Sequence, residues 1–108
     1  MLSKHNRVDT KTLNLIFKEG KFTVSPNLTF KFILTKNPTP PQISFIAPKS
    51  VAKLAVVRNK LRRLGYTALK KHITKFPVGI AGVFILKQYK DDISVLENEI
   101  QNIANKLN

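Results

Sequence analysis

The sequence KSVAKLAVVRNKLRRLGYTALKK, residues 49–71, contains eight of the chain's 19 lysines and arginines and none of its six acidic residues. Its apolar residues recur at the three- and four-residue spacing of a helix that buries one side. The apolar face consists of Leu54, Val57, Leu61, Leu64 and Ala68, with Gly65 beside it. The opposite side carries Asn59, Arg62, Arg63, Tyr66 and Lys70, flanked by Arg58 and Lys60. We therefore predict a helix over residues 50–72, N-capped by Ser50, with one packing face and one cationic face.

A shorter helix is predicted upstream, over residues 9–18 (DTKTLNLIFK). Leu13, Ile16 and Phe17 share one face of it, at the i, i+3, i+4 spacing. Asp9 or Thr10 can cap its N-terminus, and Gly20 is placed to end it.

Residues 21–34 are typical of a β-hairpin. Residues 25–27 (SPN) are a turn sequence, and the strand after them alternates Phe30, Phe32 and Leu34 with Lys31 and Ile33. A third strand is expected at residues 42–47 (QISFIA). The proline-rich segment 37–41 (NPTPP) before it is a stiff connector, because proline donates no backbone hydrogen bond.

Two elements follow the cationic helix. Residues 78–86 (VGIAGVFIL) form a short apolar run that predicts a strand buried on both faces. A last helix begins at Asp91 or Asp92, with an apolar stripe made of Ile93, Leu96, Ile100, Ile103 and Leu107.

The element order α-β-β-β-α-β-α predicts one α+β domain over residues 1–108, a sandwich in which helices pack on a mostly antiparallel four-stranded sheet. If strands 42–47 and 78–86 run parallel, the general rule makes the helical crossover between them right-handed.

The net charge of +13 is unevenly distributed, because four of the six acidic residues lie between positions 91 and 99. Charge of this size opposes folding by self-repulsion, which favours an anionic partner. The sequence has no cysteine, no apolar run of about 20 residues and no secretory signal. We therefore expect a cytoplasmic protein without disulfides or a membrane span.

The cationic face of helix 50–72 has three interpretations. It is a solvated surface, a membrane-binding face or a nucleic-acid interface. The four basic residues between positions 58 and 63 have no acidic residue three or four places away to pair with, which disfavours a merely solvated surface. The neighbouring strands need the small apolar face of this helix as cover, which disfavours membrane binding. Arginine forks suit bidentate phosphate contact, and Asn59 and Tyr66 add hydrogen bonding and stacking, so RNA is the expected partner.

No catalytic or metal-binding residue is expected in the protein itself. His5 and His72 lie in predicted flexible or helix-end positions, and a helix N-terminus accounts for the adjacent Asp91 and Asp92. The sequence contains no P-loop, zinc-ligand spacing or nucleophile elbow.

The phenylalanines have two interpretations. The simplest places Phe17, Phe22, Phe30, Phe32 and Phe45 in the core. Alternatively, one or two of Phe17, Phe30 and Phe32 line an exposed groove and stack on unpaired bases. Strand alternation puts Phe30 and Phe32 on one face, so these two would share a role.

The segment KSVAKLAVVRNKLRR, residues 49–63, resembles the signature of the bacterial ribonuclease P protein subunit, approximately KKVxxxAVxRNRxKRxxRE. Residues 6–8 (NRV) and 16–20 (IFKEG) resemble the family's opening segment, which ends in VFKxG. The resemblance covers residues 2–107 in element order and 46–66 in motif detail. Pro48 and Ser50 depart from it, as does the segment 64–66 (LGY). Lys60 replaces the second arginine of RNR, which keeps the charge and loses the fork.

The resemblance implies an α+β sandwich with a left-handed βαβ crossover. It implies a protein that assists an RNA catalyst in removing the 5′ leader of precursor tRNA, with Mg²⁺ held mainly by that RNA. Contacts with the catalytic RNA would come from Lys49, Lys53, Arg58, Asn59, Lys60, Arg62 and Arg63, and the exposed helical face adds Tyr66 and Lys70. A cleft between the first helix and the sheet would bind the leader through Phe17 and either Phe30 or Phe32.

On this interpretation the protein acts as a monomer in the complex, and neither DNA nor a membrane is a partner. The alternative is a structural RNA-binding protein, such as a ribosomal protein, without an enzymatic role.

Overall fold

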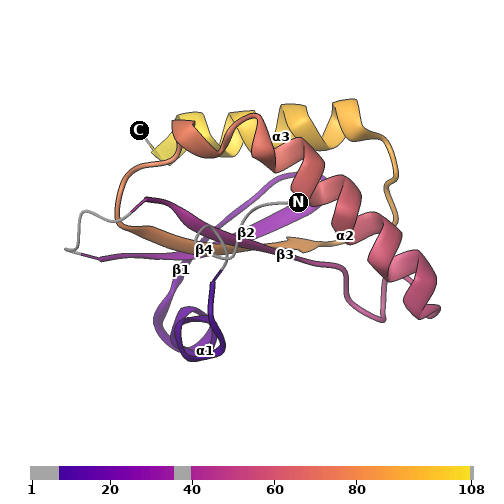
Figure 1. Cartoon of the computed structure of the whole chain (residues 1–108), viewed down its shortest axis with the longest axis horizontal. Helices are drawn as coiled ribbons and strands as arrows, with labels where there is room; N and C mark the ends of the chain where they lie inside the picture. The colour runs from indigo at the N-terminus through magenta and orange to yellow at the C-terminus, as the bar shows by residue number, and fades with distance from the viewer. Residues whose placement is uncertain (1–7, 36–39, 108) are drawn as a thin grey trace.

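The structure is a computed structural model that describes residues 8–35 and 40–107. Its elements are α1 (Thr10–Glu19), β1 (Lys21–Val24), β2 (Leu28–Leu34), β3 (Gln42–Ile46), α2 (Ala55–Lys70), a 3₁₀ turn η2 (Ile73–Lys75), β4 (Ile80–Leu86) and α3 (Ile93–Leu107). Helices α2 and α3 cover one face of the sheet, and α1 lies on the other (Figure 1). The predicted α+β sandwich and its element order are confirmed.

Some predicted features lie outside the described residues. They are residues 37–39 of the proline-rich connector, His5, and residues 6 and 7 of the opening segment. Within the described ranges, no helix combines the length and apolar character that a membrane span requires.

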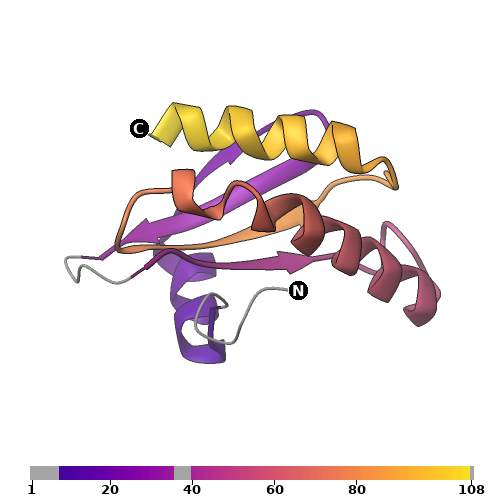
Figure 2. The ribbon, with the colours of Figure 1, turned by 45° about the horizontal axis from the view of Figure 1, so that its top comes forward.

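The sheet has the strand order β1-β2-β4-β3. The pairs β1–β2 and β2–β4 are antiparallel, whereas β3 and β4 are parallel and are joined through α2. In Figure 2, which looks toward the helices, β3 and β4 both run from left to right and β4 lies above β3. When the sheet is viewed from the helix side with β3 and β4 pointing upward, β4 therefore lies to the left of β3. A right-handed crossover would put β4 to the right, so this crossover is left-handed. The resemblance implied this handedness, and the expectation from the general rule was wrong.

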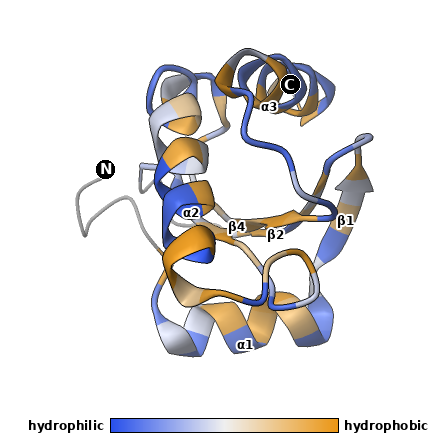
Figure 3. Ribbon diagram, turned by 90° about the vertical axis from the view of Figure 1, so that its right-hand side faces the viewer, coloured by the Kyte–Doolittle hydropathy of each residue, from blue (hydrophilic) through white to orange (hydrophobic). Residues whose placement is uncertain are grey.

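The main core lies between the sheet and the pair α2 and α3. Phe30, Phe45 and Phe84 are among its largest fully buried side chains, and the ring centroids of Phe30 and Phe84 are 4.4 Å apart. Helix α2 comes very close to β3 at Gly65, where an added Cβ atom would lie 2.5 Å from the Phe45 ring. Figure 3 shows the apolar sheet end-on between the helical layers.

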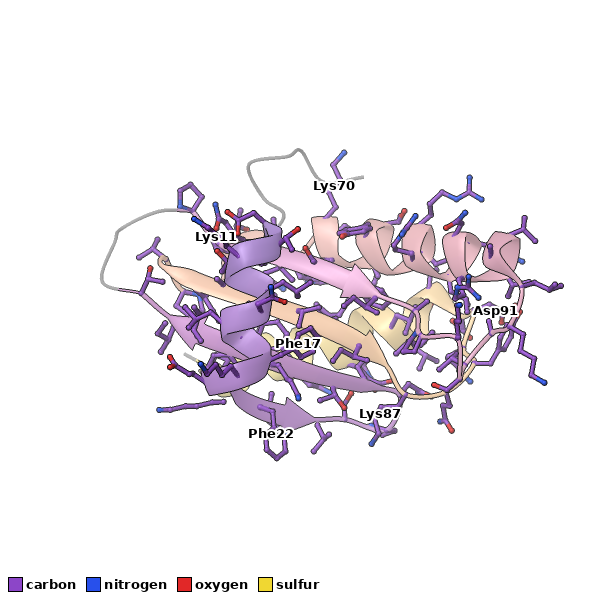
Figure 4. The ribbon with its side chains drawn as sticks, turned by 90° about the horizontal axis from the view of Figure 1, so that it is seen from below. Lys11, Phe17, Phe22, Lys70, Lys87 and Asp91 are labelled. Atoms are coloured by element: carbon purple, nitrogen blue, oxygen red, sulfur yellow. The ribbon has the colours of Figure 1, made fainter. Side chains whose placement is uncertain are left out.

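A smaller core lies beneath α1, where Ile16, Ala81 and Val83 are buried. The predicted ends of α1 are confirmed. Asp9 Oδ1 accepts a hydrogen bond from Thr12 N at 2.8 Å, which lowers the pKa of the Asp9 carboxyl, and Gly20 follows the last helical residue. Because α1 is a single short helix, it covers only part of this face of the sheet (Figure 4).

Helix α2 begins later than predicted, at Ala55. The prediction that Ser50 caps it is wrong, because the N-cap is Leu54, which makes no side-chain capping bond. The chain turns first at Pro48, whose carbonyl accepts from the amides of Val51 and Ala52 at 3.0 and 3.3 Å. These amides are used in the turn, so the helix starts after it.

Two further predicted element starts also shift by small amounts. Strand β4 starts at Ile80, because Gly79 has a φ of 79° that suits a turn. Helix α3 starts at Ile93, and Asp92 Oδ1 accepts from Ser94 N at 2.9 Å, as expected of a helix N-terminus.

A buried carboxylate fixes the β1–β2 turn against α3. Glu99 accepts hydrogen bonds from Asn27 N at 2.8 Å, from Asn27 Nδ2 at 2.6 Å and from Ser25 Oγ. Ser25 N also donates to Leu28 O at 2.8 Å, which closes the turn. The turn that joins β1 and β2 in their observed register is therefore held against α3 by Glu99.

Candidate RNA interface

The solvent side of α2 and the turn before it carry exposed basic and amide side chains, which we call the cationic surface: Lys49, Lys53, Asn59, Lys60, Arg62, Arg63 and Lys70. Lys70 points away from the sheet in Figure 4. Within residues 8–35 and 40–107, the ion pair seen is Lys71 with Glu97, at 3.3 Å, and no member of the cationic surface takes part in one. Their mutual repulsion is therefore uncompensated, which is the electrostatic condition for binding a polyanion.

Two members of the cationic surface hold each other in place. Arg62 Nη2 donates to Asn59 Oδ1 at 3.0 Å, one helical turn away. Because Arg62 is exposed, its remaining guanidinium donors can still reach a phosphate.

Arg58 differs from its neighbours, because the residue is partly buried and its guanidinium is already hydrogen-bonded. Its Nη1 donates to Ala52 O at 3.0 Å and to Lys53 O at 2.7 Å. Sequence reasoning placed Arg58 among the RNA contacts and did not foresee this second use.

The prediction that Tyr66 lies on the exposed face is wrong. Its side chain is only 4% exposed, and its hydroxyl accepts a hydrogen bond from Phe45 N at 3.1 Å. The physical reason is that the C-terminal half of α2 packs against both β3 and α3, so its buried arc is wider than one apolar stripe. Leu69 and Ala68 are buried by the same packing.

The predicted leader contacts Phe30 and Phe32 are also wrong. They share one face of β2, as alternation predicted, but this face is the main core beneath α2 and α3. Their exposed fractions are 0% and 8%, and their rings stack with centroids 5.4 Å apart. Both rings therefore belong to the main core, and Phe32 also lines a hollow beside α1.

The exposed rings on the α1 side come from α1 and β1. Phe17 is 44% exposed and Phe22 is 66% exposed, and Figure 4 shows both at the lower side of α1. Lys31 pairs in register with Phe22, and its Nζ lies 5.3 Å from the centre of the Phe17 ring. Val24, two residues along β1, is also exposed. We call Phe17, Phe22, Val24 and Lys31 the aromatic surface.

Sequence reasoning missed Phe22, which it assigned to the core. The available signal was Lys31, a lysine in the middle of a strand between two phenylalanines. A charge at this place indicates that the second face of the sheet is partly open to water. The ring of Phe22, which pairs with Lys31 across the hairpin, is then exposed as well.

A hollow of about 410 Å³ lies where α1 meets β1 and β2. It is lined by Leu15, Glu19, Lys21, Phe32, Ile33, Leu34 and Thr35. The hollow lies beside the aromatic surface, but Lys21 and Phe22 are successive residues of β1, so their side chains leave opposite faces of the strand.

The described residues contain no group of three or more histidine, cysteine, aspartate or glutamate side chains that could hold a metal ion. Asp92 caps α3, and Asp91 accepts a hydrogen bond from the Tyr89 hydroxyl at 3.2 Å, which raises the pKa of Tyr89. His72 is half-buried directly after α2.

The fold is similar to those of solved bacterial ribonuclease P proteins. The fold superimposes on the protein from Thermotoga maritima with a TM-score of 0.80 at 19% identity, over 94% of this chain and 97% of that one. For the protein from Staphylococcus aureus the TM-score is 0.77 at 17% identity, over 98% and 100%. A second structure of the S. aureus protein gives 0.72 at 19% identity, over 100% and 96%. The fold class is therefore that of these proteins.

The family model for Ribonuclease P matches residues 2–108, and the chain belongs to the ribonuclease P protein family. The family consists of tRNA-processing subunits of an endoribonuclease whose holoenzyme contains RNA. The curated proteins contain no match to this chain.

Proposed function

We propose that this chain is a ribonuclease P subunit that binds the catalytic RNA through the cationic surface and the 5′ leader of precursor tRNA through the aromatic surface. The observation that carries the proposal is the division between the two sides of the sheet. Unpaired cations lie on α2, and exposed rings lie beside α1. Folded RNA and single-stranded RNA need these two different surfaces.

The cationic surface suits folded RNA. Double-stranded RNA is recognised mainly through its shape, phosphates and 2′-hydroxyl groups, which lysine, arginine and asparagine can all contact. Arg62 and Arg63 offer planar forks for phosphate, whereas Lys60 and Lys70 offer point charges. Each phosphate neutralised releases counterions, so binding would weaken steeply as salt is raised.

The aromatic surface suits a flexible single strand. Phe17 and Phe22 offer apolar rings on which two unpaired bases can stack, and Lys31 between them can contact the linking phosphate. Stacking tolerates every base, because each has a π-face. We therefore expect the leader to be bound with little preference for its sequence.

The chemistry itself would be supplied by Mg²⁺ held mainly by the catalytic RNA. The protein's own contribution is charge: its lysines and arginines lower the repulsion between the phosphates of the catalytic RNA and those of the precursor. The protein should therefore reduce the Mg²⁺ concentration that cleavage requires.

The test compares two RNAs of equal length and charge, a ribonuclease P RNA and a ribosomal RNA fragment, for binding to the protein in physiological salt. We expect the ribonuclease P RNA to bind at least a hundredfold more tightly, and the complex to prefer precursor over mature tRNA. Equal binding of both RNAs would favour the structural RNA-binding alternative. A complex that binds precursor and mature tRNA equally would remove the leader role.

A further inference from the structure

We propose that Arg58 is a positioning residue that holds the turn 48–53 against the start of α2 and so presents Lys49 and Lys53 to RNA. For its effect on RNA this role rests on the proposed function, whereas the order of the turn can be measured without RNA.

The junction between turn and helix has no side-chain cap of its own. Leu54 occupies the N-cap position, and leucine has no oxygen that could accept from the first amides of the helix. Arg58, one turn further along α2, instead connects the helix to the turn by donating hydrogen bonds to backbone carbonyls. Its Nη1 bridges the carbonyls of Ala52 and Lys53, the last two residues before the N-cap.

The Arg58 bridge orders the second half of the turn, next to α2, which the backbone hydrogen bonds to Pro48 do not fix. The carbonyl of Pro48 accepts from Val51 N and Ala52 N, which fixes the first half. Ala52 is buried, whereas Lys49 and Lys53 are exposed on either side of it. Without Arg58, the backbone at Lys53 would be free to move relative to α2.

Arginine suits this role better than lysine. Two hydrogen bonds from a charged donor are stronger than neutral ones, and the planar guanidinium keeps both acceptors in a fixed geometry. Lysine at this position would keep the charge and lose the fixed bridge.

The first measurement uses the free protein and ¹⁵N relaxation. In the wild type we expect backbone order parameters for residues 49–53 near the value of about 0.85 that is typical of rigid structure. In Arg58→Lys they should fall toward about 0.6 or below, while those of α2 stay unchanged. Arg62→Lys is the matched control, since Arg62 bonds only to a side chain on its own helix, and it should leave the turn ordered.

The second measurement is the affinity for ribonuclease P RNA in a mutant cycle. Arg58→Lys should weaken binding about tenfold although the net charge is unchanged. In a protein that already carries Lys49→Gln and Lys53→Gln, the same change should weaken binding less than about twofold, because the turn no longer presents any charge.

Each outcome decides the proposal. An ordered turn in Arg58→Lys, or an equal loss of affinity with and without the two turn lysines, would overturn it. If no form of the protein binds ribonuclease P RNA, the proposed function fails, and the relaxation data still show whether Arg58 orders the turn.

Discussion

Phe22 is the residue whose replacement tests the aromatic surface most cleanly. It lies on the edge strand β1 with 66% of its side chain exposed, and it pairs with Lys31. We consider Phe22→Ala, with Phe22→Tyr and Phe22→Leu as matched variants. Tyrosine keeps an aromatic ring for stacking, and leucine keeps apolar area without one.

The expected magnitudes follow from exposure. Truncating a fully buried phenylalanine costs about 3–5 kcal/mol, so a ring that is only one-third buried should cost about 1 kcal/mol of stability. Stacking of one base on an aromatic ring contributes about 1–3 kcal/mol, which is roughly 5- to 150-fold in affinity. Phe22→Ala should therefore leave the protein folded and weaken leader binding by an amount equal to or larger than its cost in stability.

The assay is equilibrium binding of the reconstituted holoenzyme to precursor tRNA with a leader of five nucleotides and to mature tRNA. Phe22→Ala and Phe22→Leu should weaken precursor binding and leave mature tRNA unaffected, and Phe22→Tyr should retain most of the preference. Phe17→Ala should act in the same direction. Equal losses for both RNAs, or full retention in Phe22→Leu, would refute the stacking role.

Three further predictions concern α2. Arg62→Ala should reduce the slope of log affinity against log salt by about 0.7–0.9, measured with ribonuclease P RNA, and an unchanged slope would remove Arg62 from the interface. Tyr66→Phe should leave that slope unchanged and lower the free energy of unfolding by about 1–3 kcal/mol in urea, because Phe45 N is left without its partner. Gly65→Ala should also be destabilising, by about 1–2 kcal/mol, since its Cβ would overlap the Phe45 ring and the gain in helix propensity offsets only part of the cost. Greater stability in Gly65→Ala would show that the contact with β3 can relax.

The sequence was sufficient to predict the elements, their order and the cationic helix. Local signals are strong there: Asp9 and Gly20 delimit α1, and the stripe of α3 is buried as expected at Leu96, Ile100 and Ile103. The handedness of the crossover followed only from the family resemblance, because a general rule based on strand twist points the other way.

Tyr66 shows why a helical wheel alone failed. The wheel assumes one apolar stripe, which is correct for a helix that packs on a single surface. Helix α2 packs on β3 and α3 together, and which elements surround a helix is a property of the tertiary structure. Tyrosine adds to the ambiguity, because its hydroxyl can satisfy a buried amide.

The aromatic surface was misplaced because the hairpin register was unknown. A turn of three residues, 25–27, would pair Val24 with Leu28 and put Phe22 opposite Phe30 in the core. In the structure Ser25 closes the turn with Leu28, and Phe22 pairs with Lys31 on the other face. A shift of one residue exchanges the two faces of a strand, and the observed turn is held by Glu99, a residue more than seventy positions away that local sequence does not reveal.

The most direct test of the central claim is multiple-turnover cleavage of precursor tRNA by a ribonuclease P RNA at a Mg²⁺ concentration too low for the RNA alone. We predict that adding this protein restores cleavage at the mature 5′ end, and that a variant with Lys60, Arg62 and Arg63 all changed to glutamine restores much less. If the wild-type protein binds the RNA and cleavage is not restored, the chain does not act as a ribonuclease P subunit with that RNA, and the account is contradicted.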